Sequence, residues 1–253
     1  MSAKNKLDQY FTKPEIARHY SEKIKDLFGE YSPLIEPSAG DGAFSFNFDN
    51  IKSYDLEPRF KACYKQDFLS KDFLPESGAI FVGNPPFGKN SSLALKFLNK
   101  CCESGARAIC FILPKTFKKK FFQEKVNLSY SVSYWEDVPQ NSFLLEGVPY
   151  DVPCVFQIWE PCQRGRIEIE NIWFEEVPKS EATFCVRRVG GKAGVVLNGL
   201  EHSESSTYFF RELFPGVKEK IKSLETVLRE EARNTAGVRS ISKKEICYFL
   251  QNT

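Results

Sequence analysis

Residues that bind transition metals are scarce or badly spaced in this sequence. It has 2 histidines, His19 and His202, and no two of its 8 cysteines have CxxC spacing. Zinc sites are usually built from Cys and His pairs at short spacing. We therefore expect no metal site, and we expect reduced, mostly buried thiols of the kind found in cytosolic proteins.

Long apolar runs and a strong excess of one charge are also missing. The longest apolar run, residues 108–114, is far shorter than the roughly 18 residues that span a bilayer, and residues 1–9 are too polar for a signal peptide. We therefore expect no membrane segment and a cytoplasmic location. A net charge of +2 excludes a polybasic coat protein, but it leaves room for a nucleic-acid site confined to one cleft.

Methionine is nearly absent, with 1 residue, whereas phenylalanine is abundant, with 23. Aromatic side chains that fill a core account for most of them, and some are candidates for base-stacking surfaces. Strands that alternate with helices predict an α/β fold with a parallel sheet. The expected strands cover 34–35, 51–54, 79–83, 108–113, 130–135 and 152–159, and the expected helices cover 14–28, 91–102 and 116–124.

The pattern of apolar and charged residues changes near residue 160, which predicts a domain boundary there. We expect one domain over residues 1–160 and a small α+β region over 161–253, which carries the whole excess of positive charge. In the second region we expect strands at 166–174, 182–189 and 195–197 and helices at 217–229 and 243–250. Ser242 and Glu245 have capping-box spacing at the start of the last helix.

A glycine turn follows the first expected strand, within residues 34–44 (LIEPSAGDGAF). Gly40 and Gly42 allow a tight turn whose free backbone N–H groups let a nucleotide-like ligand come close. Asp55 ends the next strand, where a carboxylate can accept both hydroxyls of a ribose. Asp67 could accept from an exocyclic amine, and Phe68 could pack on an adenine ring.

The tetrapeptide Asn84-Pro85-Pro86-Phe87 follows the fourth strand and is suited to chemistry on an aromatic amine. The lone pair of such an amine is delocalised into the ring, so the nitrogen is a poor nucleophile. The Asn84 side-chain carbonyl and the Pro85 backbone carbonyl can accept its two protons and draw the nitrogen toward a tetrahedral form. Phe87 offers a face on which a planar substrate stacks. This arrangement fits direct in-line attack on an activated methyl group.

With these motifs in order, residues 7–160 resemble the S-adenosylmethionine-dependent amino-methyltransferases, most closely the gamma-type N6-adenine DNA methyltransferases. QYFTKP at 9–14 resembles their N-terminal motif, LIEPSAGDGAF the first cofactor motif, NPPF the catalytic motif and FILP at 111–114 a later strand motif. The resemblance implies a Rossmann-like, seven-stranded, mostly parallel sheet. It also implies that the cofactor contacts are Phe11, Thr12, Glu36, Ser38, Ala39, Gly40, Asp55, Asp67 and Phe68.

The resemblance further implies that Asn84 to Phe87 hold the target amine and that a second aromatic ring lies on the far side of a flipped base. Phe143 is the first choice for that ring and Tyr150 the alternate, although core packing explains Phe143 equally well. The chain departs from the family pattern, since the segments between Gly40 and residue 51 and between Asp55 and Asp67 are too short for full crossover helices.

Basic side chains at two places are candidates for phosphate contact. Lys118 lies in a lysine-rich stretch with interleaved phenylalanines at 115–122, which also fits a solvated helix face. Arg187 and Arg188 precede the Gly190-Gly191 turn, which also fits an ordinary hairpin.

The leading hypothesis is an N6-adenine methyltransferase that acts on DNA, with the base flipped out of the helix. Methylation of adenine in RNA and methylation of a protein glutamine at N5 pose the same chemical problem at nitrogen. A non-catalytic nucleic-acid-binding subunit is the remaining alternative, and the intact NPPF argues against it. DNA is favoured over RNA as the partner.

Overall fold

A computed structural model describes residues 10–29, 33–162, 169–235 and 237–253, and the chain folds into two compact units. The first unit contains the described residues up to Pro114 and from Lys125 to Cys162. The second unit contains Lys115–Glu124 and the described residues from Ile169 onward. A single boundary near residue 160 therefore does not describe the two units fully, because the segment 115–124 belongs to the second unit.

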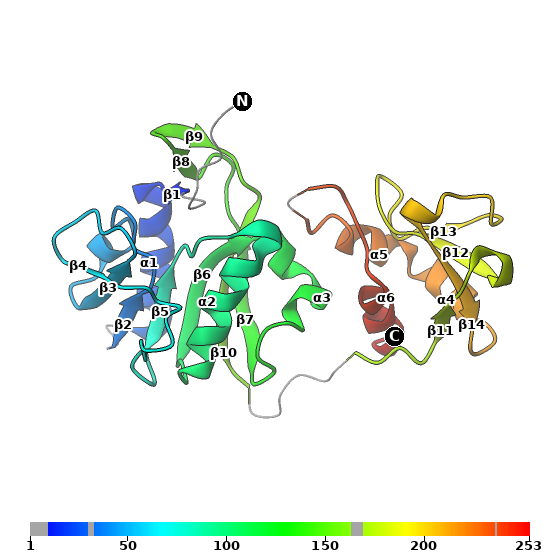
Figure 1. Cartoon of the computed structure of the whole chain (residues 1–253), viewed down its shortest axis with the longest axis horizontal. Coiled ribbons are helices and arrows are strands. Elements are labelled where there is room, and N and C mark those ends of the chain that lie inside the picture. The colour runs from blue at the N-terminus through cyan, green and yellow to red at the C-terminus, as the bar shows by residue number, and fades with distance from the viewer. Residues whose placement is uncertain (1–9, 30–32, 163–168, 236) are drawn as a thin grey trace. The chain divides into compact units, whose positions relative to one another are not determined.

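The first unit is built on a seven-stranded mixed sheet (Figure 1). All neighbouring strands pair in parallel except at β10, which pairs antiparallel with both β6 and β7. This confirms the mostly parallel α/β sheet. The strand order is β4 (Cys63–Lys65), β3 (Ile51–Asp55), β2 (Leu34–Glu36), β5 (Ile80–Gly83), β6 (Ala108–Pro114), β10 (Cys154–Pro161) and β7 (Tyr130–Asp137).

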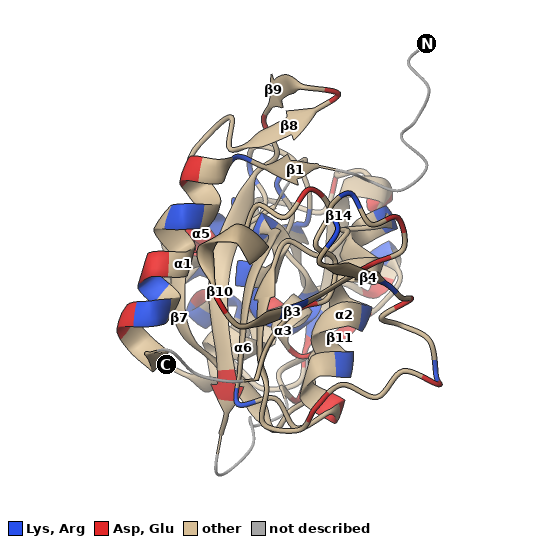
Figure 2. Cartoon of the chain, turned by 90° about the vertical axis from the view of Figure 1, so that its left-hand side faces the viewer, with Lys and Arg blue, Asp and Glu red and all other residues tan. Residues whose placement is uncertain are grey.

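Two helices pack on this sheet, α1 (Pro14–Phe28) and α2 (Ser92–Glu103). Proline at the first position of α1 suits a helix start, because that N–H has no partner within the helix. The inner face of α1 packs on the sheet through Tyr20, whose ring stacks on Phe156 of β10 at 4.2 Å. Figure 2 shows acidic and basic segments interspersed along α1, as expected for a helix with one face in water.

The early crossovers are short, as the sequence predicts. Between β2 and β3 the described chain forms only a single 3-10 turn at Ser45–Asn47, and between β3 and β4 it forms no helix. The outer strand β4 is correspondingly exposed, since Tyr64 keeps 62% of its surface in water.

A small three-stranded sheet, which the sequence does not predict, joins the N-terminal motif to a distant hairpin. It has the order β1 (Phe11–Thr12), β8 (Phe143–Leu145) and β9 (Val148–Tyr150). Thr12 pairs with Phe143, and Phe143 pairs with Tyr150. The hairpin turn places Glu146 and Gly147 at positive φ (53° and 79°), as tight two-residue hairpins require.

The second unit is an antiparallel sheet with helices. Its order is β11 (Phe174–Glu176), β14 (Thr207–Glu212), β12 (Phe184–Arg187) and β13 (Val196–Leu197), with α4 (Val217–Ser223), α5 (Glu225–Glu231) and α6 (Lys243–Gln251). The sequence prediction misses β14 and joins α4 to α5, and of the strand expected at 166–174 only Phe174 lies in a strand, residues 163–168 being outside the described part. The Ser242–Glu245 capping box is confirmed at the start of α6.

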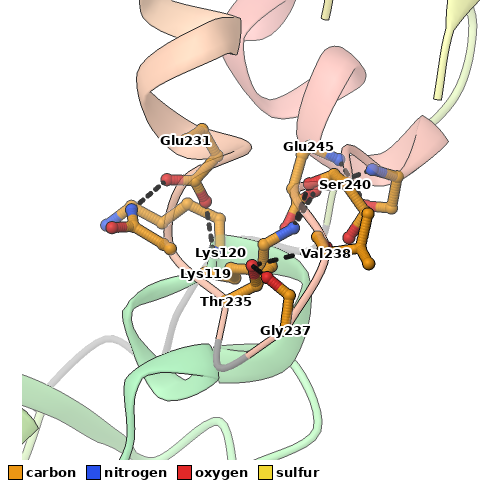
Figure 3. Close-up of polar contacts among 10 residues, drawn as sticks. Lys119, Lys120, Glu231, Thr235, Gly237, Val238, Ser240 and Glu245 are labelled. Carbon is orange, nitrogen blue, oxygen red and sulfur yellow. Dashed lines mark hydrogen bonds and ion pairs between the residues drawn. The ribbon is translucent and has the colours of Figure 1, made fainter. Parts of the chain in front are cut away.

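The segment 115–124, including α3 (Lys120–Gln123), is anchored in the second unit by a buried polar cluster (Figure 3). Lys119 is 5% exposed, and its ammonium lies 3.3 Å from Oε2 of the fully buried Glu245 and donates to the carbonyl of Ser240. The backbone N–H of Lys120 donates to Glu231. Lys119 is therefore a structural residue and does not lie on the solvated helix face that the sequence suggests. No helix among the described residues is long and apolar enough to cross a bilayer.

Candidate functional site

A cavity of about 510 Å³ opens at the carboxyl ends of the parallel strands of the first unit. In doubly wound sheets this edge is where ligands bind. The loops that follow β2, β3, β4 and β5 line the cavity, together with the N-terminal residues 10–12. The lining includes every residue that the sequence assigns to cofactor contact or catalysis: Phe11, Thr12, Glu36, Ser38, Ala39, Gly40, Asp55, Asp67, Phe68, Asn84, Pro85, Pro86 and Phe87.

The glycine turn after β2 is tied to the end of β3. The N–H of Gly40 donates to Oδ2 of Asp55 at 2.8 Å, and the N–H of Glu57 donates to Oδ1 of the same carboxylate at 2.8 Å. Gly40 has a φ of +54°, and a Cβ there would lie 3.1 Å from the ring of Phe11. Glycine is needed for both reasons. Asp55 thus anchors the turn, a role that its position at a strand end did not reveal.

Glu36 is a buried carboxyl group without a cationic partner in the described part of the chain. It accepts a hydrogen bond from the Ser45 hydroxyl, which also contacts the Ser53 hydroxyl at 2.6 Å. Burial, with a smaller contribution from the charges of Asp41 and Asp55, raises the pKa of Glu36 to about 8. Hydrogen bonds from Ser45 oppose this shift without overcoming it. A cationic ligand in the cavity would supply the missing partner.

The charge of the cavity lining favours such a ligand. Arg59 is the one basic residue among the described lining residues, and its guanidinium lies 4.3 Å from the centroid of the Phe11 ring. The same lining contains five carboxyl groups: Glu36, Asp41, Asp55, Glu57 and Asp67. S-adenosylmethionine carries a sulfonium and an ammonium against one carboxylate, so the acidic lining fits it. Glu36 would hold a cationic group of this cofactor, and Asp55 or Glu57 would hold its ribose.

The tetrapeptide Asn84-Pro85-Pro86-Phe87 presents an acceptor without a partner among the described residues. Nδ2 of Asn84 donates to the backbone carbonyl of Tyr10 at 3.0 Å. Since that carbonyl can only accept, the hydrogen bond fixes which way the amide faces. Oδ1 of Asn84 is buried and has no hydrogen-bond partner among the described residues, a condition that is rare in folded proteins and calls for an explanation. Thr12 Oγ1, also in the lining, is a second buried oxygen without such a partner.

Backbone contacts hold the tetrapeptide at the start of α2. The carbonyl of Phe87 accepts from the N–H groups of Leu93 and Ala94 at 3.1 and 3.2 Å. Gly88 has a φ of +69°, and a Cβ there would lie 2.6 Å from Cβ of Leu93. Gly88 is a site residue that the sequence reasoning missed, and its position directly after NPPF was the available signal.

The two aromatic candidates for the far side of the base are placed differently. The Phe143 side chain is fully buried and does not line the cavity, because its strand pairs in register with Thr12 of β1. Tyr150 is 42% exposed and stacks on the ring of Tyr10 at 5.4 Å, with 13° between the rings. Tyr10 in turn lies 5.9 Å from Phe87. The structure therefore places Phe143, the first choice, in the core and away from the cavity lining. Tyr150, the alternate, contacts Tyr10, which is part of the lining.

Phe68 lines the cavity but keeps only 1% of its surface exposed, since it stacks on Phe97 at 5.2 Å. The Phe68 ring is therefore part of the packed core and offers little surface for a ligand to stack on. Other lining residues that the sequence reasoning did not select are Leu56 and Arg59. Leu56 directly follows Asp55 and is 51% exposed. Its side chain is therefore an apolar surface at the cavity on which a planar ring can pack.

The basic candidates Lys118, Arg187 and Arg188 belong to the second unit and do not line the cavity. Arg187 donates to the Ser206 hydroxyl, and Arg188 donates to the Ser205 carbonyl at 3.2 Å and lies 5.7 Å from the Tyr208 ring. Both arginines therefore brace the 203–206 loop. The described residues contain no group of three or more His, Cys, Asp or Glu that could hold a metal ion.

Comparison with known sequences gives a partial match. No family model matches the sequence. The chain is 29% identical over 160 residues to the protein ENHANCED DOWNY MILDEW 2 of Arabidopsis thaliana, and the match covers 55% of this chain and 12% of that protein. The chain therefore spans only a small part of the length of this relative.

Among solved structures, the chain is similar to a proposed RNA methyltransferase from Pyrococcus horikoshii (TM-score 0.49, 16% identity, 63% of this chain and 90% of that chain). It is also similar to a modification subunit of a proposed type I restriction enzyme from Vibrio vulnificus (TM-score 0.47, 10% identity, 62% and 45%). The strand order of the seven-stranded sheet, with β10 as its single antiparallel strand, is that of the Rossmann-like methyltransferase fold.

Proposed function

We propose that this protein transfers a methyl group from S-adenosylmethionine to the N6 amine of adenine in DNA. The observation that carries the proposal is the unpaired Oδ1 of Asn84, buried in the lining of an acidic cavity at the carboxyl edge of the sheet. A buried carbonyl oxygen without a partner is costly unless a ligand satisfies it. An N–H group of an aromatic amine is a donor of the right chemistry.

In this proposal, some residues of the first unit bind the cofactor and others bind the target base. Glu36 and the glycine turn held by Asp55 lie on the cofactor side, and the bound cofactor supplies a methyl group activated by the positive sulfur. Asn84 Oδ1 and the Pro85 carbonyl accept the two N–H groups of the target amine, which localises the nitrogen lone pair toward the methyl carbon. The nitrogen–carbon bond forms as the carbon–sulfur bond breaks, and one amine proton leaves to water.

This chemistry needs no covalent intermediate and no strong general base. Orientation supplies much of the rate, because two groups held at attack distance react as one molecule. The amide of Asn84 is preorganised for this role by its bond to the Tyr10 carbonyl, so that little reorganisation is needed at the moment of reaction.

We assign the first unit to cofactor binding and catalysis and the second unit to nucleic-acid contact. The formal charge excess of the chain lies after residue 160, and Arg187, Arg188 and Lys118 are the basic side chains assigned to phosphate contact. Direct attraction to phosphates would make such binding fall with salt.

The test is methyl transfer from tritiated S-adenosylmethionine into double-stranded DNA, single-stranded DNA, RNA and bulk protein, with the modified unit identified after digestion. N6-methyladenine in DNA is the expected product. Label in RNA adenine or in protein glutamine would replace the DNA assignment with one of these alternatives.

The residue test is Asn84→Ala. Loss of the acceptor should lower kcat by roughly 10²- to 10³-fold, as for other preorganised polar groups in active sites, with little change in the calorimetric affinity for the cofactor. Asn252→Ala, in the exposed end of the second unit, is the matched control and should keep full activity. Equal loss of transfer and of cofactor affinity in Asn84→Ala would contradict the assigned role.

A further inference from the structure

Three aromatic rings from distant parts of the chain meet beside Asn84. The ring of Tyr10 lies 5.9 Å from that of Phe87 and 5.4 Å from that of Tyr150. Tyr10 directly precedes β1, and Tyr150 ends β9. The pairing of β1 with β8 and of β8 with β9 brings them together (Figure 1). Tyr10 therefore connects the catalytic Phe87 to the exposed hairpin.

The spacing of these rings leaves no room for a planar substrate on Phe87. Two rings that sandwich a third must lie about 7 Å apart, since each carbon–carbon contact takes 3.5–4.0 Å. The Tyr10 and Phe87 rings are closer than that and are tilted by 31°. Phe87 is only 7% exposed, so it has little free ring surface elsewhere. A base that stacks on Phe87 must compete with the ring of Tyr10.

The backbone of Tyr10 need not move when its ring does. The Tyr10 carbonyl is held by Nδ2 of Asn84 at 3.0 Å, whereas the side chain can change rotamer about its Cα–Cβ bond. Tyr150 is 42% exposed, and every residue of β9 is exposed, so the Tyr150 ring on which Tyr10 stacks lies at the protein surface. The ring can leave Phe87 while the carbonyl keeps the Asn84 amide oriented.

We infer that Tyr10 is an aromatic gate for the target base: its ring covers Phe87, and an incoming base takes its place while the Tyr10 carbonyl stays on Asn84. This inference rests on the proposed function, because it assumes a planar base as substrate. It makes Tyr10 a positioning residue with two separable parts. The ring opposes base binding, and the backbone carbonyl supports catalysis.

The size of the effect follows from the contact that the base must replace. An aromatic pair of this kind corresponds to roughly two- to tenfold in an equilibrium constant. Tyr10→Ala removes the ring and keeps the carbonyl, so it should strengthen base binding by that factor. Tyr10→Phe keeps the ring and should therefore not show this gain in binding.

The experiment is a fluorescence titration of the full chain with a thymine oligonucleotide that carries one 2-aminopurine, in saturating S-adenosylhomocysteine. An all-thymine oligonucleotide, followed by anisotropy of a dye, measures binding without the purine. The expected result is tighter binding by Tyr10→Ala of the 2-aminopurine oligonucleotide only. Tyr64→Ala, which removes a tyrosine 62% exposed outside the cavity lining, is the control and should match the wild type.

Weaker binding by Tyr10→Ala would overturn the gate, because it would make the Tyr10 ring part of the stacking surface. Unchanged binding, or no purine-dependent binding by any of the proteins, would overturn it as well. Methyl transfer to the matching adenine oligonucleotide is measured separately. If transfer is absent while Tyr10→Ala still binds the purine more tightly, the proposed function fails and the gate stands. If transfer occurs without that change in binding, the gate alone fails.

Discussion

Replacement of the buried carboxyl group of Glu36 by an amide should make the protein more stable at alkaline pH. Glu36 is 2% exposed, and burial raises its pKa from 4.5 to about 8. The folded protein therefore keeps this proton up to about pH 8, whereas the unfolded chain gives it up above about pH 4.5. Stability from this group is fully present below pH 4.5, declines as the pH rises from 4.5 to about 8, and is constant at higher pH, where both states have lost the proton.

The magnitude follows from the difference between the two pKa values. Each unit is worth about 1.4 kcal/mol, so the wild type should lose up to about 5 kcal/mol of stability between pH 4.5 and 8 through this one group. Glu36→Gln resembles the protonated form at every pH and removes this loss. The variant should match the wild type near pH 5 and exceed it by several kcal/mol at pH 9.

The assay is urea unfolding of both proteins at pH 5, 7 and 9 without cofactor, followed by tryptophan fluorescence, to which the buried Trp159 of the first unit contributes. Cofactor affinity by calorimetry completes the test. A cationic ligand must deprotonate Glu36 in order to pair with it, so wild-type affinity should rise from pH 6 to 9, and the affinity of Glu36→Gln should be lower and flat. Parallel pH dependences of stability in the two proteins would refute the reasoning.

Three further outcomes follow from the contacts described above. Asp55→Ala should release the glycine turn and lower cofactor affinity by about tenfold or more, since it removes two backbone hydrogen bonds to a carboxylate; unchanged calorimetric affinity would remove Asp55 from the site. Lys119→Met leaves the buried Glu245 unpaired and should destabilise the second unit by about 3–5 kcal/mol in thermal unfolding, whereas the double variant with Glu245→Met should regain most of that loss. Arg187→Ala with Arg188→Ala should weaken DNA binding and reduce the slope of log affinity against log salt by up to about two; an unaltered slope would assign the phosphate contacts elsewhere.

The sequence was informative wherever function follows from strand order. Glycines, carboxylates and the NPPF motif each follow an apolar run, and the carboxyl ends of parallel strands share one edge of a sheet. Local order along the chain therefore placed eleven of the thirteen predicted residues at one cavity, whereas Phe11 and Thr12, which lie in β1, were named only through the family resemblance. It was also enough to predict the shortened crossovers, because chain length limits what can form between two strands.

Predictions that depended on partners far along the chain were weaker. Phe143 and Tyr150 have similar aromatic character, and only the pairing of β8 with β1 turns the first into core and leaves the second beside Tyr10. The lysine-rich segment 115–124 reads as a solvated helix in sequence. It becomes part of the second unit because Glu245, more than a hundred residues later, neutralises Lys119 in the interior.

By itself, the sequence determined which chemical groups are available and which strand ends carry them: an acidic, glycine-bearing edge and the amide of Asn84, which two prolines follow. The tertiary structure decided how they act. The Tyr10 carbonyl, 74 residues before Asn84, orients the amide and leaves Oδ1 as the free acceptor. Burial in the folded chain keeps the proton on Glu36, against the hydrogen bonds from Ser45, which favour its loss. Both effects arise from contacts between residues distant in sequence, and such contacts exist only once the chain has folded.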